Sequence, residues 1–333
     1  MAAVPKITLN NGKQMPVLGL GTYTASPQEM MKIVKAAIDC GYRHFDTAFL
    51  YQTEKYLGQA VRDKIAEGVI KREDVFIVSK LWCTYHRPDL VIEGCKKTLE
   101  NLGLDYVDLF LIHWPSSFQP VDEIKGYKEP GEGVSILDCP QFFPLGENNE
   151  IIPGETDFVE TWKSMEKCVD MGMAASIGIS NFNSEQIDRL LKSARIKPVT
   201  NQVEVNPYLN QKKLIDFCAK RDIWITAYGP LGLQIPMNDS GIPRLVENPK
   251  IVALAKEVNK TPAQVILRYL IQSKTIPIPK TSNVARLSEN ISVFDFTLND
   301  AQMAIMDSLD CNRRLCVIPG TQKHKNYPFS IDF

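Results

Sequence analysis

Short apolar runs alternate with amphipathic stretches along almost the whole chain. The apolar runs are continuous and do not alternate residue by residue, a pattern typical of strands buried on both faces of a parallel sheet. We predict eight such strands, at residues 18–21, 42–47, 75–80, 107–113, 176–180, 199–204, 223–228 and 275–279. Helical patterns lie between them, with no break in composition. We therefore predict an α/β fold, a (β/α)8 TIM barrel, as a single domain over residues 1–333.

Sequence signals for helix starts support this interpretation. Ser26-Pro27 precedes Glu29, and Thr261-Pro262 precedes Gln264, so each set is a capping box with proline at the first helical position. Gly41 is expected to end the first of these helices. Apolar stripes at helical spacing occur at Met30, Val34, Ala37 and Ile38, and at Ile251, Leu254, Ala255 and Val258.

Three segments lie outside the barrel repeat. Asn11-Gly12 separates short apolar strands at residues 7–9 and 14–17, which predicts an N-terminal β-hairpin with a type I′ turn. Residues 116–152 form a long loop after the fourth strand, rich in glycine, proline and acidic residues. Loops that follow barrel strands surround the active site, so this long loop is predicted to be a lid. The C-terminal residues 311–333 are expected to form a second loop over the active site.

Composition narrows the classes of partner. Lysine plus arginine number 38 and aspartate plus glutamate 39, so the net charge is -1. A chain this neutral has no global electrostatic reason to bind nucleic acid or an anionic membrane. Its start lacks the basic and apolar regions of a secretory signal, and no run reaches about 20 apolar residues. We expect a cytoplasmic monomer that binds a small molecule, without a nucleic-acid or membrane partner.

Cysteine and histidine spacing gives no sign of metal or disulfide chemistry. The 8 cysteines are scattered without a CxxC pair, so we expect reduced thiols. No two of the 4 histidines have the spacing of metal ligands, so no metal site is predicted. His44 is expected in the packing between helices and barrel, and His86 in a loop.

Titratable residues end three successive predicted strands. Asp46, Lys80 and His113 each stand at the carboxyl end of an apolar run. A single polar residue there would be explained as structural, but three on successive strands favour an active site, since barrel chemistry occurs at this end.

Tyr51 lies five residues after Asp46 and is a candidate general acid. A phenol has a pKa of about 10, so donating a proton near pH 7 benefits from a pKa lowered by about 2–3 units. One ammonium at about 4 Å contributes about 4 kcal/mol at an effective dielectric of about 20, so Lys80 is sufficient. Asp46 would keep Lys80 charged and oriented.

A competing pattern is Tyr51-x-x-x-Lys55, the spacing used by short-chain dehydrogenases. Those enzymes carry a glycine-rich dinucleotide loop near the N-terminus. Here Gly19 and Gly21 are not followed by a third glycine. Lys55 is therefore predicted to be a solvated helix lysine.

Later strand ends carry groups suited to a flat ring and an anion. Ser180, Asn181 and Gln202 offer hydrogen bonds to a planar amide, and Tyr228 offers a ring for stacking. After the last strand, Lys280, hydroxyl residues and a helix start form a candidate anion cradle. The barrel's usual phosphate site lies at strands seven and eight, which favours this interpretation over a plain helix start.

These motifs together resemble the aldo-keto reductases of the aldose/aldehyde-reductase type. The resemblance spans nearly the whole chain, in the order GLGT (19–22), GYRHFDTAFLY (41–51), SKLW (79–82), LDYVDLFLIHWP (104–115), IGISNF (177–182), NQVEVNPY (201–208), AYGPLG (227–232), IPIPKT (276–281) and YPF (327–329). It implies NADPH-dependent reduction of aldehydes or ketones to alcohols. It also implies a catalytic tetrad of Asp46, Tyr51, Lys80 and His113.

The resemblance further implies two sets of binding residues. Those for NADPH are Gly21, Thr22, Tyr23, Asp46, Ser180, Asn181, Gln202, Tyr228, Leu231, Lys280, Thr281, Ser282, Arg286, Glu289 and Asn290, with the cations on a 2′-phosphate. Those for the substrate are Tyr23, Phe49, Trp82, His113, Trp114, Phe142 and Phe143. Tyr23, Phe49 and Gly229 depart from the residues usual in close relatives, which puts the substrate in doubt but not the tetrad. The long loop and tail resemble an insect branch that includes 3-dehydroecdysone reductases.

Two other classes of function are compatible with a barrel. One is a non-catalytic cofactor-binding or structural protein of the same superfamily, which a damaged tetrad would favour. The other is an unrelated barrel enzyme, such as a lyase or an isomerase. The tetrad is intact in this sequence, so a reductase of bulky or apolar carbonyls, ketosteroids included, is the prediction carried forward.

Overall fold

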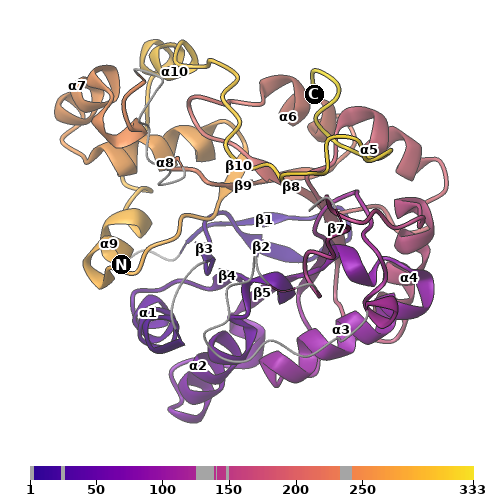
Figure 1. The fold of residues 1–333 in the computed structure, drawn as a ribbon. Helices are drawn as coiled ribbons and strands as arrows, with labels where there is room; N and C mark the ends of the chain where they lie inside the picture. Colours follow the sequence, from indigo (N-terminus) through magenta and orange to yellow (C-terminus); the bar gives the residue numbers. More distant parts are fainter. Residues whose placement is uncertain (1–3, 24–26, 125–138, 140, 148–149, 233–241) are drawn as a thin grey trace.

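The strands form a closed parallel ring in the computed structural model, which describes residues 4–23, 27–124, 139, 141–147, 150–232 and 242–333 (Figure 1). The sheet order is β10-β9-β8-β7-β6-β5-β4-β3. The backbone N–H groups of Gly19 and Gly21 donate to Pro277 O and Pro279 O, both at 3.1 Å, and so join the two ends of the sheet. The strands are β3 Leu20–Gly21, β4 His44–Asp46, β5 Phe76–Leu81, β6 Leu109–Ile112, β7 Ile177–Ser180, β8 Thr200–Glu204, β9 Trp224–Tyr228 and β10 Thr275–Pro277.

The predicted barrel is confirmed, and each predicted strand ends within one or two residues of an observed one. Helices surround the strands (Figure 1). The capping box at Thr261 is confirmed, since the Thr261 side chain accepts from Gln264 N and the Gln264 side chain accepts from Thr261 N. The predicted cap at Ser26 lies outside the described residues. The helices are α1 Pro27–Asp39, α2 Glu54–Ala66, α3 Pro88–Leu102, α4 Phe158–Asp170, α5 Ser184–Leu191, α6 Lys212–Ala219, α7 Pro249–Glu257, α8 Pro262–Gln272, α9 Val284–Ile291 and α10 Asp300–Asp307.

Strand alternation divides the apolar side chains into two cores. An inner core fills the barrel and includes Phe76, Val78 and Leu111, while neighbours such as Ile77 pack outward against the helices. His44 lies on the inner side, where its ring packs edge-on against Phe76 with centroids 5.6 Å apart. The prediction that His44 sits between helices and barrel is wrong, because its strand register matches that of the inward-facing Asp46, two residues on.

The N-terminal hairpin closes the bottom of the barrel. Strands β1 Lys6–Thr8 and β2 Gln14–Pro16 pair antiparallel, and Leu9 and Met15 join the inner core. The predicted type I′ turn is wrong, since Gly12 has a positive φ of 82° and Asn11 does not. A longer turn forms instead, in which the Asn11 side chain donates to Ser176 Oγ at 2.9 Å and so fixes the hairpin to the barrel.

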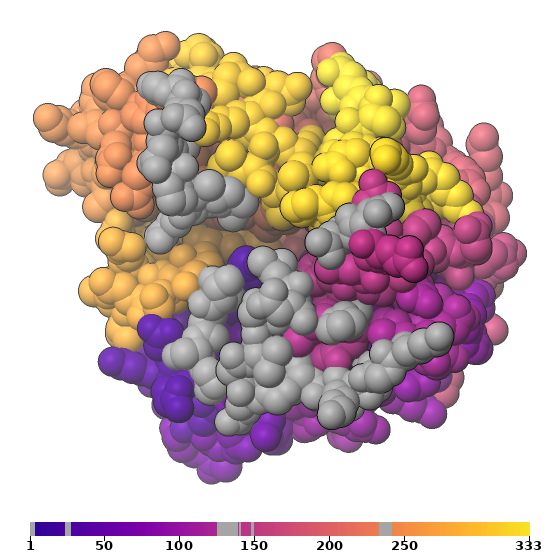
Figure 2. All heavy atoms as spheres, viewed as in Figure 1, coloured from indigo at the N-terminus to yellow at the C-terminus, as the bar shows by residue number. Residues whose placement is uncertain are grey.

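The C-terminal tail crosses the end of the barrel beside the described parts of the long loop. Figure 2 shows the yellow tail against the magenta residues of this region. Ser116 Oγ donates to Asn326 O at 3.2 Å, and Lys323 pairs with Glu150 at 3.3 Å. Residues 125–138, 140 and 148–149 of the predicted lid lie outside the described residues, so the lid stays a prediction.

None of the helices in the described ranges is long and apolar enough to cross a membrane. All eight cysteines are free thiols.

Candidate active site

Asp46, Lys80 and Gln202 form a buried network where their strands end. Lys80 Nζ donates to Asp46 Oδ1 at 2.6 Å and to Thr47 O at 2.8 Å, and Gln202 Nε2 donates to Asp46 Oδ2 at 2.7 Å. Both carboxylate oxygens of Asp46 are therefore bonded. β4, β5 and β8 bring these side chains together from positions far apart in the sequence, as the strand-end pattern predicts.

Tyr51 ends a short 3₁₀ turn, η1 Phe49–Tyr51, and faces this network. Lys80 Nζ lies 4.8 Å from the centre of the Tyr51 ring. The Tyr51 and His113 rings pack edge-on with centroids 5.6 Å apart. The structure thus brings the four residues of the predicted tetrad to one place.

The protonation of Tyr51 differs from the expectation. Burial, followed by the negative charge of Asp46, raises the pKa of its phenol well above the ordinary value of 10. The prediction that Lys80 lowers this pKa is wrong, because burial of the phenol has the largest effect on the pKa and Asp46 offsets the charge of the Lys80 ammonium. The phenol is therefore protonated at neutral pH, the form that a proton donor requires.

His113 is buried and neutral. Burial, and then the positive charge of Lys80, lower its pKa well below the ordinary value of 6.5. Its ring packs edge-on against Trp82 at 5.2 Å, and its carbonyl accepts from Asn181 Nδ2 at 3.0 Å. A neutral imidazole in this position retains an N–H that can donate to a carbonyl oxygen.

The predicted ring-binding residues form a second network beside the first. Tyr228 OH donates to Asn181 Oδ1 at 2.8 Å, and Ser180 Oγ donates to Gln202 O at 2.8 Å. Asn181 has a left-handed backbone with φ 62°, which turns its amide back towards the barrel. Of the other residues in this set, Leu231 packs partly buried against the core.

Residues 21–23 lie at the joint that closes the barrel. Gly21 forms a parallel bridge with Lys280, so the first strand and the predicted anion cradle are adjacent. Thr22 Oγ1 donates to Asp46 O at 3.0 Å. Tyr23 is 48% exposed and packs edge-on against Tyr51 at 5.0 Å, so it covers the phenol from solvent.

The predicted anion cradle presents two exposed cations. Lys280 and Arg286 are exposed, and neither forms an ion pair with an acidic residue in the described parts of the chain. They flank the start of α9, where Thr281 Oγ1 accepts from Asn283 N at 3.0 Å and Ser282 is exposed. Glu289 accepts from Thr261 Oγ1 at 2.6 Å, and Asn290 is buried. Free cations beside a helix start fit a phosphate.

The model of a known protein family, described as the aldo/keto reductase family, matches residues 17–311. The chain belongs to the aldo-keto reductases. It is 43% identical over 337 residues to the prostaglandin-E(2) 9-reductase of Oryctolagus cuniculus, with 98% of each chain covered. It is 42% identical over 332 residues to the estradiol 17 beta-dehydrogenase 5 of Mus musculus, with 97% of each covered.

A solved structure agrees with these relatives. The aldo-keto reductase of Bombyx mori in complex with NADP is 36% identical and has a TM-score of 0.86, with 98% of this chain and 100% of that chain covered. This aldo-keto reductase is an NADP-dependent oxidoreductase, as its sequence predicts.

In this aldo-keto reductase, aromatic side chains pack around the predicted tetrad. Trp82 Nε1 donates to Phe142 O at 2.7 Å, and the ring of Phe49 packs edge-on against that of Phe142 at 5.8 Å. Trp114 packs edge-on against Phe329 of the tail at 5.9 Å. All the predicted substrate residues except Tyr23 and His113 belong to or pack against this apolar cluster, which consists of Leu50, Trp82, Cys83, Trp114, Phe118, Cys139, Phe142 and Ile318, with Phe49, Tyr51, Phe143, Ile151, Cys316 and Phe329 around it.

Sequence reasoning missed two residues of the site. Glu204 ends β8 and its buried carboxylate accepts from the backbone N–H of Leu315 at 3.0 Å and of Cys316 at 2.8 Å, which holds the tail. The signal used for Asp46 and Lys80, a charged residue at a strand end, would have found it. Cys316 packs in the cluster with Tyr51, and no local pattern marks it.

Two further residues complete the comparison. Lys55 is exposed, so its prediction as a solvated lysine is confirmed. His86 follows the short turn η3 Cys83–Tyr85, as predicted, but it is buried. Burial lowers its pKa to about 3, so it is neutral.

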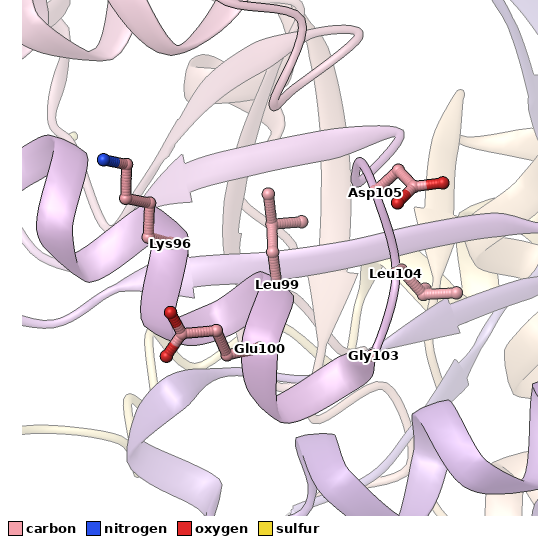
Figure 3. A pocket seen from close by; sticks show the side chains of 6 residues that line it. All are labelled: Lys96, Leu99, Glu100, Gly103, Leu104 and Asp105. Atoms are coloured by element: carbon pink, nitrogen blue, oxygen red, sulfur yellow. The ribbon is translucent and has the colours of Figure 1, made fainter.

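A surface groove lies elsewhere, at the carboxyl end of α3 (Figure 3). Its lining comes from the last turns of the helix and the residues before β6: Lys96, Leu99, Glu100, Gly103, Leu104 and Asp105. Because these residues precede β6, the groove is at the barrel end opposite the tetrad.

Proposed function

We propose that this aldo-keto reductase reduces aldehydes or ketones to alcohols with NADPH, and that Tyr51 is the general acid. The observation that carries the proposal is the meeting of Tyr51, His113 and the Lys80–Asp46 pair at the carboxyl end of the barrel. Family membership by itself supports a carbonyl reductase, and the roles of the individual residues rest on this geometry.

The proton is supplied by the neutral phenol of Tyr51. Its raised pKa keeps the proton in place until a carbonyl oxygen beside it gains negative charge and becomes the stronger base. The Lys80 ammonium near the ring then stabilises the phenolate that forms, and Asp46 holds that ammonium in place. The neutral imidazole of His113 orients the carbonyl oxygen through its N–H.

The chain offers a complete set of residues for the cofactor. Lys280 and Arg286 are exposed without acidic partners in the described ranges, which suits the extra phosphate of NADPH. Ser180, Asn181 and Gln202 would bond the nicotinamide amide, with Tyr228 against the ring. Bound NADPH supplies the hydride.

The substrate class we infer is bulky or apolar carbonyls, including ketosteroids. The approach to Tyr51 is lined by Trp82, Trp114 and Phe49, which offer large apolar area and few hydrogen bonds. A polyhydroxylated sugar would leave polar groups unmatched there, at about 1–3 kcal/mol each. Two relatives are named for a prostaglandin and for estradiol, which supports the same class.

A cofactor-binding or structural protein without turnover is the alternative. Oxidation of NADPH in the presence of an aromatic aldehyde separates the two functions. The tryptophan fluorescence of a binding protein would be quenched when NADPH is added, but that protein would not oxidise NADPH. The intact constellation around Tyr51 favours the enzyme.

The deciding experiment is Tyr51→Phe. Loss of a positioned acid costs about 10²–10⁴-fold in turnover. We expect kcat with an aromatic aldehyde to fall by that factor while the Kd for NADPH, followed by tryptophan fluorescence, stays the same. Tyr106→Phe removes a phenol that precedes β6, at the opposite end of the barrel, and is the matched control that should retain kcat. A Tyr51→Phe enzyme with half the turnover would contradict the proposed acid.

Several other features stay predictions. We propose a single domain, a monomer and a cytoplasmic location. The insect branch also stays a prediction, since the Bombyx mori protein and the mammalian relatives are similar to this chain at comparable levels.

A further inference from the structure

We propose that Glu54 is a positioning residue for proton transfer: its buried carboxyl group clamps the turn that carries Tyr51 to the strand that carries Lys80. This inference rests on the proposed function, because it assigns Glu54 a role only if Tyr51 and Lys80 act together. Glu54 takes no part in the network around Asp46 and lies on the other side of β5, among the helices.

The contacts of Glu54 join three elements. It is the first residue of α2 and is 1% exposed. One carboxyl oxygen, Oε1, accepts from Ser79 Oγ of β5 at 2.6 Å, and the other, Oε2, accepts from Asn101 Nδ2 of α3 at 2.8 Å. A buried carboxyl group held by two short hydrogen bonds makes a stiff joint.

Each end of this joint is one short step from a group of the tetrad. Ser79 is the neighbour of Lys80 on β5, and strand alternation points Ser79 outward and Lys80 inward. Glu54 is three residues after Tyr51, so the bond to Ser79 ties together the backbones that carry the phenol and the ammonium.

The residues between Tyr51 and Glu54 transmit the constraint. Gln52 is fixed in a left-handed conformation with φ 56°. The hydroxyl of Thr53 is bonded to that of Thr47 at 3.0 Å and to that of Thr22 at 3.2 Å. A turn held at both ends and in the middle has little freedom, so a shift of Glu54 is passed to the Tyr51 ring.

The surroundings contain no direct ionic partner for Glu54. Among the described residues, the groups that act on its carboxyl are Ser79, Asn101 and Thr98, together with the charge of Lys80 across the strand. Cys95 of α3 faces it as a neutral thiol. Since no ion pair fixes Glu54, the two hydrogen bonds fix the joint, and they can be removed one at a time.

The test compares the two hydrogen bonds of Glu54: the strand arm, from Ser79 of β5, and the helix arm, from Asn101 of α3. Ser79→Ala and Asn101→Ala each remove one hydrogen bond to the same carboxyl, but only Ser79 connects to the Lys80 strand. Glu54→Gln keeps the shape, since its amide can accept from Asn101 and donate to Ser79, and Glu54→Ala removes the joint. For each variant, kcat and KM are measured with NADPH and an aromatic aldehyde, and the Kd for NADPH by tryptophan fluorescence.

We expect Glu54→Ala to lower kcat by about 10–100-fold, because misplacing a reacting group by about 1 Å has costs of this size. Ser79→Ala should lower kcat by about 5–10-fold, while Asn101→Ala and Glu54→Gln stay within about threefold. The Kd for NADPH should stay within about threefold in all four, since the cofactor residues are on other strands. If Glu54 had only a structural role, Ser79→Ala and Asn101→Ala would both change stability, and their kcat values would not differ.

Two results would overturn the inference: unchanged kcat in a folded Glu54→Ala, or equal kcat in Ser79→Ala and Asn101→Ala. Should Glu54→Ala fail to fold, the comparison of the two arms decides alone. Failure of the proposed function is seen separately, without any Glu54 variant, as a wild-type protein that does not oxidise NADPH or a Tyr51→Phe variant that keeps its turnover. That result overturns both proposals.

Discussion

Burial sets the protonation of the side chains around the tetrad more strongly than any single neighbouring charge does. It raises the pKa of Tyr51 and lowers those of His113 and Lys80. For Lys80, the adjacent Asp46 opposes the effect of burial. The outcome is a neutral phenol and a neutral imidazole beside the ammonium of Lys80. The phenol has a proton to transfer, and the ammonium can stabilise the phenolate that remains.

At the residue scale, Glu54 should make folding stability depend on pH. Burial raises its pKa from 4.5 to about 7, which corresponds to about 3 kcal/mol. Below pH 4.5 the carboxyl is protonated in both folded and unfolded states, and this stability is fully present. Between pH 4.5 and 7 the unfolded chain has released this proton while the folded protein still holds it. The stability therefore falls over this range and is lost once pH has risen through the folded pKa of about 7.

Glu54→Gln removes this dependence on pH. The free energy of unfolding of the variant minus that of the wild type should therefore increase by about 2–3 kcal/mol from pH 5 to pH 8. Urea denaturation at these two pH values measures the difference. A constant difference between the two proteins over this range would show that Glu54 ionises as it does in the unfolded chain.

A second prediction at this scale concerns Arg286. Its exposed guanidinium has no acidic partner among the described residues, and a bond to a phosphate is about twice as strong as a neutral one. Arg286→Ala should raise KM for NADPH by about tenfold or more and change KM for NADH little. Arg195→Ala removes an exposed arginine from the opposite end of the barrel and serves as the control. Equal effects on both cofactors would mean that Arg286 does not distinguish them.

At the scale of elements, close contact between α2 and α3 supports the turn that carries Tyr51. Gly58 lies in α2 where a Cβ would come within 1.9 Å of the carbonyl oxygen of Leu102, at the end of α3. Only glycine permits this approach, because the obstacle is backbone and cannot rotate away. The same two helices are joined by Glu54 and Asn101, so their spacing and the joint depend on each other.

Gly58→Ala should therefore be destabilising by about 3 kcal/mol, at the upper end of the range for overpacked sites. Urea denaturation of this variant is compared with that of Gly146→Ala, where a Cβ meets only ordinary contacts at 3.7 Å. Gly146→Ala should stay within about 0.5 kcal/mol of the wild type. Equal stability of the two variants would show that α2 and α3 can separate freely.

For the whole molecule, the tail connects distant parts of the chain at the barrel end that holds the tetrad. Glu204 of β8 holds Leu315 and Cys316, and the side chain of Asn183 donates to Pro328 O at 2.8 Å. Directly after the second anchor, Phe329 packs against Trp114. The final Phe333 packs against Phe217 on the outside, at a centroid distance of 6.1 Å.

Two aromatic residues of one tail thus give a matched pair. Phe329→Ala should lower kcat/KM for a bulky aromatic aldehyde by about 5–10-fold more than for a small aliphatic one, because an aromatic contact is worth about 0.5–1.5 kcal/mol beyond its area. Phe333→Ala should change stability only. Steady-state kinetics with the two aldehydes and thermal unfolding measure both effects. If the ratio of kcat/KM for the two aldehydes is unchanged in Phe329→Ala, the tail does not determine substrate preference.

The barrel and the four residues of the predicted tetrad follow from local patterns of the sequence. Apolar runs at regular intervals require parallel strands buried on both faces, and Asp46, Lys80 and His113 mark the strand ends where such a barrel brings side chains together. These features are local in the sequence, so they could be predicted without knowing the packing. Glu204 carries the same signal at the end of β8.

The directions in which side chains face, and the depth of their burial, depend on how the helices and strands pack together. The inward position of His44 depends on strand register, the turn at Asn11 on its bond to Ser176, and the raised pKa of Tyr51 on desolvation by surrounding elements. The joint of Glu54 with Ser79 and Asn101 unites residues 25 and 47 positions away in the sequence. Burial and long-range hydrogen bonds are properties of the packed molecule, and no local pattern of residues carries them.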